Sequence, residues 1–195
     1  MQFLAIDPGT TESAYVVMHE DYSTSAHAKV PNQQLLDLIT LGRFDAMVIE
    51  CMEARTLNVK LKRGKDGKPL PMPMQKVGME TYETCYWIGR FMEAAIRRGM
   101  DVYRVLRSEE KSRIIPTKKN KLPPLPAPVP HSPDAQIRKG LIMRFAQFDK
   151  KNGKGKANCR DVFYGFKADE WSAFAVGVVH LDKLKENALR PPADA

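Results

Sequence analysis

The stretch MQFLAIDPGTTESAYVVM at residues 1–18 decides how the fold begins. Residues 2–7 are mostly apolar and end on Asp7, Pro8-Gly9 is a turn signal, and β-branched and aromatic residues gather again near 13–18. The pattern predicts a hairpin whose first strand closes on a carboxylate.

Working outward, hydrophobic period and breaker residues predict further strands and helices along the chain. In order they are a strand at 24–30, a helix that opens at Pro31-Asn32 and stops at Gly42, a strand at 44–50, a helix at 77–99, a strand at 102–106, a helix capped by Ser132-Pro133, and a helix at roughly 167–186. Hairpins would supply antiparallel pairing and the crossovers parallel pairing. We therefore expect an α/β fold built on a mixed five-stranded sheet flanked by helices.

The length of 195 residues suits one domain of ordinary size, since domains run to about 100–200 residues. We expect this domain to span 1–186 and to carry two insertions, with a flexible tail at 187–195. The first insertion, 57–76, is rich in lysine, glycine and proline. The second, 116–132, lies in a stretch that holds seven of the fourteen prolines, so we expect a surface excursion without helix or central strand.

The charge balance is basic, with 31 Lys and Arg against 23 Asp and Glu and a net charge of +8. This favours a polyanionic partner such as nucleic acid. Three widely spaced cysteines, Cys51, Cys85 and Cys159, indicate neither a disulfide framework nor a zinc site. The first residues have no basic leader and no apolar run reaches membrane-spanning length. We expect a cytoplasmic protein, of a bacterium or a phage-infected host.

Acidic residues stand at element ends in three separate segments: Asp7, Glu50, and Asp169-Glu170. If the first and fourth strands are parallel neighbours, Asp7 and Glu50 lie about 5 Å apart. Clustered carboxylates repel unless a cation neutralises them, and hard oxygen ligands suit Mg²⁺ or Mn²⁺. Two such ions can hydrolyse a phosphodiester by in-line displacement.

Each acid also has a purely structural interpretation. Asp7 could be a turn former, and Asp169 and Glu170 could complement the dipole of the last helix. Glu50 is harder to explain in this way, because a carboxylate directly after the apolar run MVI is costly to desolvate without a partner.

In order along the chain, five segments resemble parts of RuvC-type Holliday junction resolvases, enzymes of DNA recombination and repair, and fit a divergent or phage-type member. AIDPGTTESAYVV at 5–17 resembles the first motif and VIE at 48–50 the second acidic strand end. VYRVLRSEEKSRII is similar to the segment with a basic residue near the active site, and DAQIRKGLIMRF to the helix after it. DEWSAFAVGVVH at 169–180 resembles the closing acidic helix.

The resemblance implies a ribonuclease H-like fold, a homodimer, and divalent-metal nicking of two strands of like polarity at a four-way DNA junction. Carried over position by position, it implies that Asp7, Glu50 and Asp169 bind the metal and that Lys111 contacts the scissile phosphate.

The chain departs from the family pattern in two places. The family's last helix usually carries two aspartates three residues apart, but Ser172 follows Asp169 at that spacing. Either Glu170 is the fourth ligand, or Asp169 is the second acid and Phe166 has replaced the first, or the metal site is weakened. The family also tends to have a lysine where this chain has Asp134, so Arg138 or Lys139 would have to substitute.

Basic residues cluster around the candidate site in three segments. One cluster alone would be read as a solvated face, but three favour contacts to DNA phosphates. The candidate DNA-binding residues are Lys60, Lys62, Arg63, Lys65, Lys118, Lys119, Lys121, Arg138 and Lys139.

Met72, Met74, Tyr82, Tyr86 and Trp87 allow three interpretations. They could stack on an unpaired base, they could belong to the core, which the helical spacing favours, or they could lie at a dimer interface as in the family.

The sequence thus leads to a metal-dependent, structure-selective DNA endonuclease that resolves four-way junctions. A branched-DNA-binding protein with a degraded metal site is the first alternative, because of Ser172. A phosphotransferase of the actin and hexokinase type, suggested by Asp-Pro-Gly-Thr-Thr, needs a duplicated fold for which 195 residues leave no room.

Overall fold

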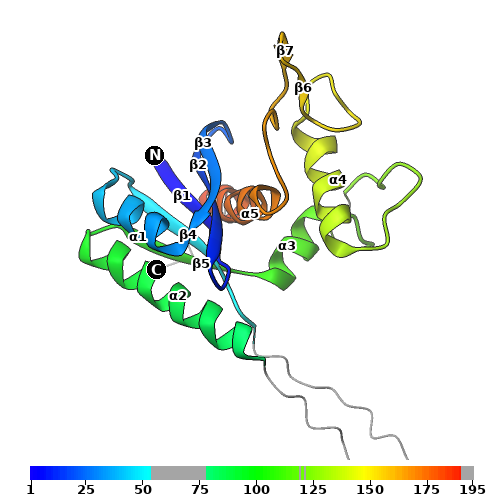
Figure 1. Cartoon of the computed structure of the whole chain (residues 1–195). Coiled ribbons are helices and arrows are strands. Elements are labelled where there is room, and N and C mark those ends of the chain that lie inside the picture. The colour runs from blue at the N-terminus through cyan, green and yellow to red at the C-terminus, as the bar shows by residue number, and fades with distance from the viewer. Residues whose placement is uncertain (54–77, 119, 121, 190–195) are drawn as a thin grey trace, which may run out of the picture.

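A computed structural model describes residues 1–53, 78–118, 120 and 122–189 of the chain (Figure 1). The insertion at 57–76, with the predicted DNA contacts Lys60, Lys62, Arg63 and Lys65, lies outside these residues. Lys119 and Lys121 also lie outside them.

The fold is a mixed five-stranded sheet, as the sequence predicted, and the structure shows that its strand order is β3-β2-β1-β4-β5. The antiparallel half is formed by β1 (Gln2–Asp7), β2 (Glu12–His19) and β3 (Thr24–Pro31). The strands β4 (Ala46–Cys51) and β5 (Asp101–Leu106) continue the sheet in parallel with β1. The carboxyl ends of β1 and β4 therefore meet at one edge of the sheet.

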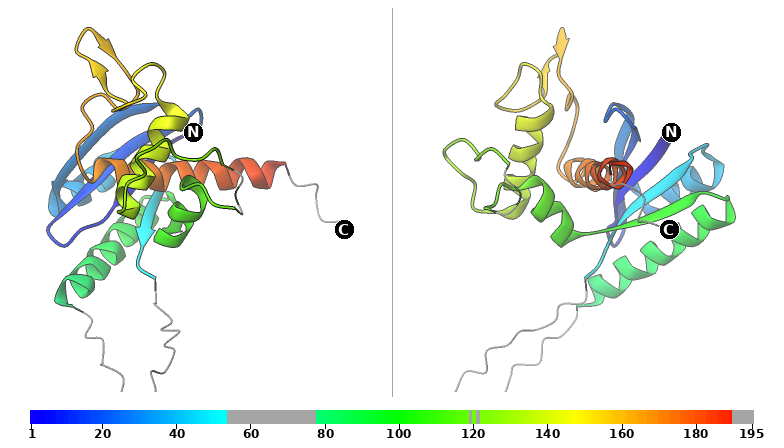
Figure 2. Two further views of the ribbon diagram at one scale, coloured as in Figure 1. Left: turned by 90° about the vertical axis from the view of Figure 1, so that its right-hand side faces the viewer. Right: turned by 180° about the vertical axis from the view of Figure 1, so that it is seen from behind.

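Helices cover both faces of the sheet (Figures 1 and 2). On one face lie α1 (Asn32–Leu41) and α2 (Met79–Arg97), and on the other lies α5 (Glu170–Ala188). Beside α5 follow α3 (Arg107–Ile114) and α4 (Pro133–Phe145). Ser132 caps α4 as predicted, because its hydroxyl accepts a hydrogen bond from the Ala135 N–H.

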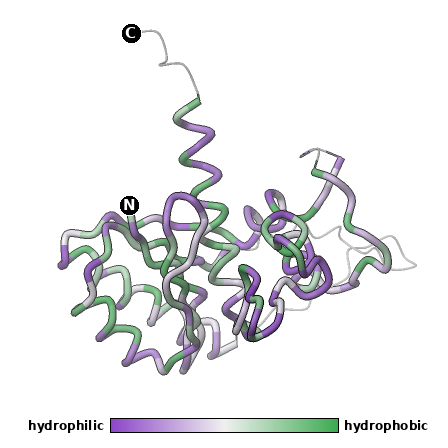
Figure 3. The backbone as a smooth tube through the Cα atoms, turned by 90° about the horizontal axis from the view of Figure 1, so that it is seen from above, coloured by the Kyte–Doolittle hydropathy of each residue, from purple (hydrophilic) through white to green (hydrophobic). Residues whose placement is uncertain are grey.

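The two faces have separate apolar cores, as the alternation of a strand requires. In β1, Phe3 and Ala5 belong to the core beneath α5, whereas Leu4 and Ile6 belong to the core beneath α1 and α2. Helix α5 approaches the sheet closely at Gly177, where an added Cβ would lie 2.1 Å from the Met18 sulfur. The first part of α5 is buried, and its last turns project beyond the sheet (Figure 3).

Three elements were not predicted. Helix α3 follows β5 directly, and a small hairpin of β6 (Gly155–Lys156) and β7 (Cys159–Arg160) lies within the expected loop at 149–160. The described part of the proline-rich insertion contains no helix or strand, as expected.

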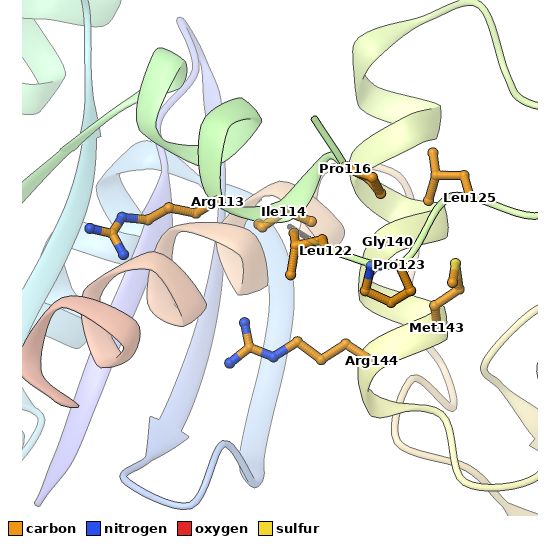
Figure 4. Close-up of a pocket in the computed structure, with 9 residues that line it drawn as sticks. All are labelled: Arg113, Ile114, Pro116, Leu122, Pro123, Leu125, Gly140, Met143 and Arg144. Carbon is orange, nitrogen blue, oxygen red and sulfur yellow. The ribbon is translucent and has the colours of Figure 1, made fainter. Parts of the chain in front are cut away.

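The proline-rich insertion packs against α4 and encloses an apolar pocket of about 170 Å³ (Figure 4). Leu122, Pro123 and Leu125 line it from the insertion, and Gly140 and Met143 from α4. In the part of the chain that the structure describes, no helix is both long and apolar enough to span a membrane.

Candidate active site

Strand alternation directs Asp7 and Glu50 to the same face of the sheet. Asp7 follows Phe3 and Ala5 in β1, and Glu50 follows Ala46 and Val48 in β4, so both carboxylates lie on the α5 face. The parallel register pairs Ile6 with Ile49 and so sets the two acids side by side. The parallel pairing of β1 with β4 confirms that the two acidic strand ends are neighbours, as predicted, and the charge of Glu50 acts on Asp7.

The third acidic segment, at the start of α5, also lies near Asp7. Asp169 is the N-cap residue of α5, and its charge acts on Asp7. Its carboxylate also lies 2.7 Å from the ammonium of Lys29 on β3. Three distant segments therefore bring Asp7, Glu50 and Asp169 together at one edge of the sheet.

These carboxylates are held in an unfavourable environment. Burial, together with the neighbouring Glu50 carboxylate, raises the pKa of Asp7 well above its usual range. Burial likewise raises the pKa of Glu50, although the nearby guanidinium of Arg107 opposes this. An acidic cluster with raised pKa values is typical of a functional site.

Helix α3 adds two side chains that the sequence analysis missed, Arg107 and Glu110. The Arg107 guanidinium lies 2.5 Å from the Glu110 carboxylate and 3.8 Å from that of Glu50, and it also binds Asp134. Burial and the charge of Glu50 raise the pKa of Glu110 to about 9. The one available signal was the i, i+3 spacing of Arg107 and Glu110, which allows an ion pair within one helix turn.

Glu170 lies apart from this cluster. Its carboxylate accepts a hydrogen bond from the Lys167 backbone N–H at 2.9 Å and lies 2.8 Å from Nδ1 of His27. On β3, His27 and Lys29 both face α5, since their partners Val16 and Ala14 belong to that core. Among the described residues, no interaction joins Glu170 to Asp7 or Glu50, so its assignment as fourth ligand stays a prediction.

Lys111 and Ser172 border the cluster. Lys111 is exposed on α3 and forms no ion pair among the residues described, so its contact with phosphate stays a prediction. Ser172 lines a hollow of about 330 Å³ together with Arg107, Asp134 and Asp169. Among the described residues, the cations that lie against the carboxylates are Arg107 and Lys29.

The predicted DNA-binding residues that the structure describes have different surroundings. Arg138 is exposed, stacks on the Trp171 ring at 4.6 Å, and lines the same hollow. Lys139 instead donates hydrogen bonds to the carbonyls of Pro126 and Pro128, which ties the proline-rich insertion to α4. Lys118 is exposed.

The aromatic residues of α2 correct one expectation. Tyr82 and Tyr86 are 59% and 61% exposed, so their interpretation as core residues is wrong. The helix instead buries Ile88, Phe91 and Ala95. Met72 and Met74 lie outside the described residues. The exposed tyrosines are compatible with a stacking surface or an interface.

The donor chemistry of the cluster suits a hard divalent cation. Carboxylate oxygens are the ligands that Mg²⁺ and Mn²⁺ prefer, and one buried oxygen of Glu110 receives no hydrogen bond from the described residues. Within the same residues, no group of three or more His, Cys, Asp or Glu side chains is placed so that it could hold a metal ion. In the structure, Arg107 and Lys29 neutralise part of the cluster.

The architecture is that of the ribonuclease H-like fold, as the solved structures similar to this chain show. RuvC of Thermus thermophilus in complex with a Holliday junction substrate is 12% identical, with a TM-score of 0.56 over 95% of this chain and 96% of that chain. A second structure of Thermus thermophilus RuvC is also 12% identical, with a TM-score of 0.54 over 96% and 97%.

At this identity the likeness is one of fold, and the fold is the one that the sequence motifs implied. No protein-family model matches the chain, and no curated protein matches it in sequence.

Proposed function

We propose that this protein is a divalent-metal-dependent, structure-selective DNA endonuclease that cleaves four-way junctions. The observation that carries the proposal is the convergence of Asp7, Glu50 and Asp169 where the carboxyl ends of β1 and β4 meet the start of α5. Carboxylates that lie so close are unfavourable without a cation and suit one well.

In this function, Asp7, Glu50 and Asp169 would hold Mg²⁺ or Mn²⁺ at the sheet edge. Bound divalent ions supply an activated water and neutralise the leaving oxygen of a phosphodiester. The Arg107 guanidinium, beside the Glu50 carboxylate, and the exposed ammonium of Lys111 on the same helix would attract the scissile phosphate.

The choice of a junction as substrate is supported by the charge and by the structural likeness. The net charge of +8 favours DNA, and Arg138 lies exposed at the hollow beside the acidic cluster. The similar RuvC structure is described with a Holliday junction. Paired nicks need two active sites, so we also propose a homodimer.

A nicking assay on a labelled synthetic four-way junction tests the function. The wild-type protein with Mg²⁺ or Mn²⁺ should release symmetric nicked products, whereas Asp7→Asn should bind the junction without cutting it. Nicking that survives in purified Asp7→Asn would overturn the assignment.

A branched-DNA-binding protein with a weakened metal site is the second candidate. It is favoured by Ser172, a hydroxyl where a carboxylate is expected, and by the contact of Glu170 with His27. This candidate predicts tight junction binding without nicking by the wild-type protein in either metal.

A further inference from the structure

Glu110 is the most deeply buried acidic residue of α3, and its position is unusual for a structural glutamate. The residue is 0% exposed, the charge of the Glu50 carboxylate acts on it, and Arg107 binds one of its oxygens at 2.5 Å. The other oxygen, Oε1, is buried and receives no hydrogen bond from any described residue. An orphaned carboxylate oxygen beside a second carboxylate is a place for a cation.

The charges around Glu110 do not balance when all the acids are ionised. Arg107 and Lys29 are the cations that contact the cluster in the described part of the chain, and they face four carboxylates: Asp7, Glu50, Glu110 and Asp169. Arg107 is also shared with Asp134. A divalent cation would supply the missing positive charge.

Helix α3 brings this carboxylate close to Glu50, since the same Arg107 nitrogen lies 2.5 Å from Glu110 and 3.8 Å from Glu50. Ser172, one turn after Asp169, offers only a hydroxyl to the hollow that it lines with Arg107. Glu170 is held by His27 and the Lys167 backbone. Glu110 is thus the fourth acid that the fold gathers with Asp7, Glu50 and Asp169.

We propose that Glu110 is the fourth carboxylate of the divalent-cation site, supplied by α3 in place of a second acid on α5. Arg107 is the positioning residue that holds this carboxylate against Glu50 when no metal is bound. The inference rests on the proposed function, because it concerns the same metal site.

A purely structural ion pair between Arg107 and Glu110 makes the opposite prediction for Glu110→Gln. If the pair stabilises the fold, the amide variant is less stable, because breaking a buried pair is costly. If Glu110 is a ligand, the variant relieves repulsion with Glu50, and Arg107 keeps Glu50 and Asp134 as partners. The metal-free Glu110→Gln protein should then melt no lower than the wild type.

Isothermal titration calorimetry of the full chain with Mn²⁺ and with Mg²⁺ tests the proposal directly. We expect Glu110→Gln to bind at least roughly 10–100-fold more weakly than the wild type, because that is the usual loss for an outer-shell partner and a direct ligand should cost no less. The matched control is Glu109→Gln, the adjacent acid, which pairs with Lys183 and caps the Leu106 N–H. The control should bind like the wild type.

The double variant Glu110→Gln/Ser172→Asp sharpens the test, because it returns a carboxylate from α5. We expect it to recover most of the lost Mn²⁺ affinity.

Three outcomes would overturn the proposal. Wild-type affinity in Glu110→Gln rejects Glu110 as a ligand and leaves the proposed nuclease intact. A Glu110→Gln protein that does not fold, by circular dichroism, supports the structural ion pair instead. A wild-type protein that binds neither metal rejects the proposed function itself, and with it this inference.

Discussion

The segment between α4 and α5 and the edge where β1 meets β4 both remove carboxylates from water, in opposite ways. Asp161 accepts four backbone hydrogen bonds of 2.8–3.0 Å, from the N–H groups of residues 147, 148, 149 and 162. Burial raises the pKa of Asp161, but these hydrogen bonds outweigh it and lower the pKa to about 2. At the sheet edge, the carboxyls of Asp7, Glu50 and Glu110 face one another and their pKa values rise.

The difference separates a structural carboxylate from a functional one. Asp161 has its own donors, so it organises the segment around the small β6–β7 hairpin without any further partner. The sheet-edge acids have too few hydrogen-bond donors, so burying their carboxylates is energetically unfavourable. A bound cation would offset this unfavourable free energy. Substitutions in the two regions test this contrast.

Glu50→Gln should strongly reduce catalysis. We expect junction cleavage to fall on the order of 10²–10³-fold, the usual cost of losing one charge-stabilising group in an active site. Nicking rates under single-turnover conditions measure the effect. Glu53→Gln is the matched control, because Glu53 is exposed and binds Ser108. An equal loss of junction cleavage in Glu50→Gln and Glu53→Gln would contradict a special role for the sheet-edge carboxylates.

Asp161→Asn should affect stability most. Asparagine has one side-chain oxygen in place of two, so part of the backbone N–H groups would lose their acceptor. We therefore expect the free energy of unfolding to fall by roughly 1–3 kcal/mol. Asp7→Asn, the same substitution at the sheet edge, should leave the stability of the metal-free protein unchanged or raised. Urea denaturation of both variants in EDTA provides the comparison, and similar destabilisation of the two would refute it.

The pH dependence of stability should have opposite signs in the two regions. The lowered pKa of Asp161 means that its contribution is complete above about pH 4 and is lost as the pH falls toward 2. The raised pKa of Glu110 means that the folded protein binds more protons than the unfolded chain between its ordinary 4.5 and about 9. Metal-free stability should therefore fall as the pH rises through that window.

Melting temperatures measured from pH 2 to 9 in EDTA test both signs, with about 2–4 °C expected per kcal/mol. Glu110→Gln should flatten the neutral-to-alkaline part of the curve, and Asp161→Asn the acidic part. If the pH dependence of the melting temperature is unchanged in a variant, the substituted residue does not cause that dependence.

Ser172→Asp alone should have the smallest effect. If Glu110 already completes the site, a further carboxylate on α5 should change Mn²⁺ affinity by less than roughly threefold, which is about 0.7 kcal/mol. Titration calorimetry measures this directly. A gain of tenfold or more in affinity, accompanied by the appearance of nicking, would favour the weakened-site alternative.

Much of the fold followed from local pattern. The five strands, the stop of α1 at Gly42 and the cap of α4 at Ser132 were all predicted, because each depends on neighbouring residues and on breakers. Helix α3 was missed because RSEEKSRI has no apolar stripe: its buried residues are Glu110 and Ile114. A helix that turns a glutamate inward does not show the hydrophobic period on which the prediction relies.

Part of the candidate site was also predicted from local pattern. Asp7, Glu50 and Asp169 mark element ends, and strand parity alone sets the first two on one face. The resemblance implied Lys111, and Arg107 was not considered, because the sequence does not reveal which basic side chain of α3 turns toward β4. Tyr82 and Tyr86 follow the helical spacing of core residues, yet α2 turns them to solvent.

Short stretches of sequence were enough to predict the five sheet strands, four of the helices and the three acids at element ends, since these depend on periodicity, turns and strand parity. Only the tertiary structure decided that Arg107 and Glu110 join those acids, that Glu170 pairs with His27, and that Asp161 is satisfied within its own segment. The environment of a charge depends on segments that meet in space, and local pattern does not encode those meetings.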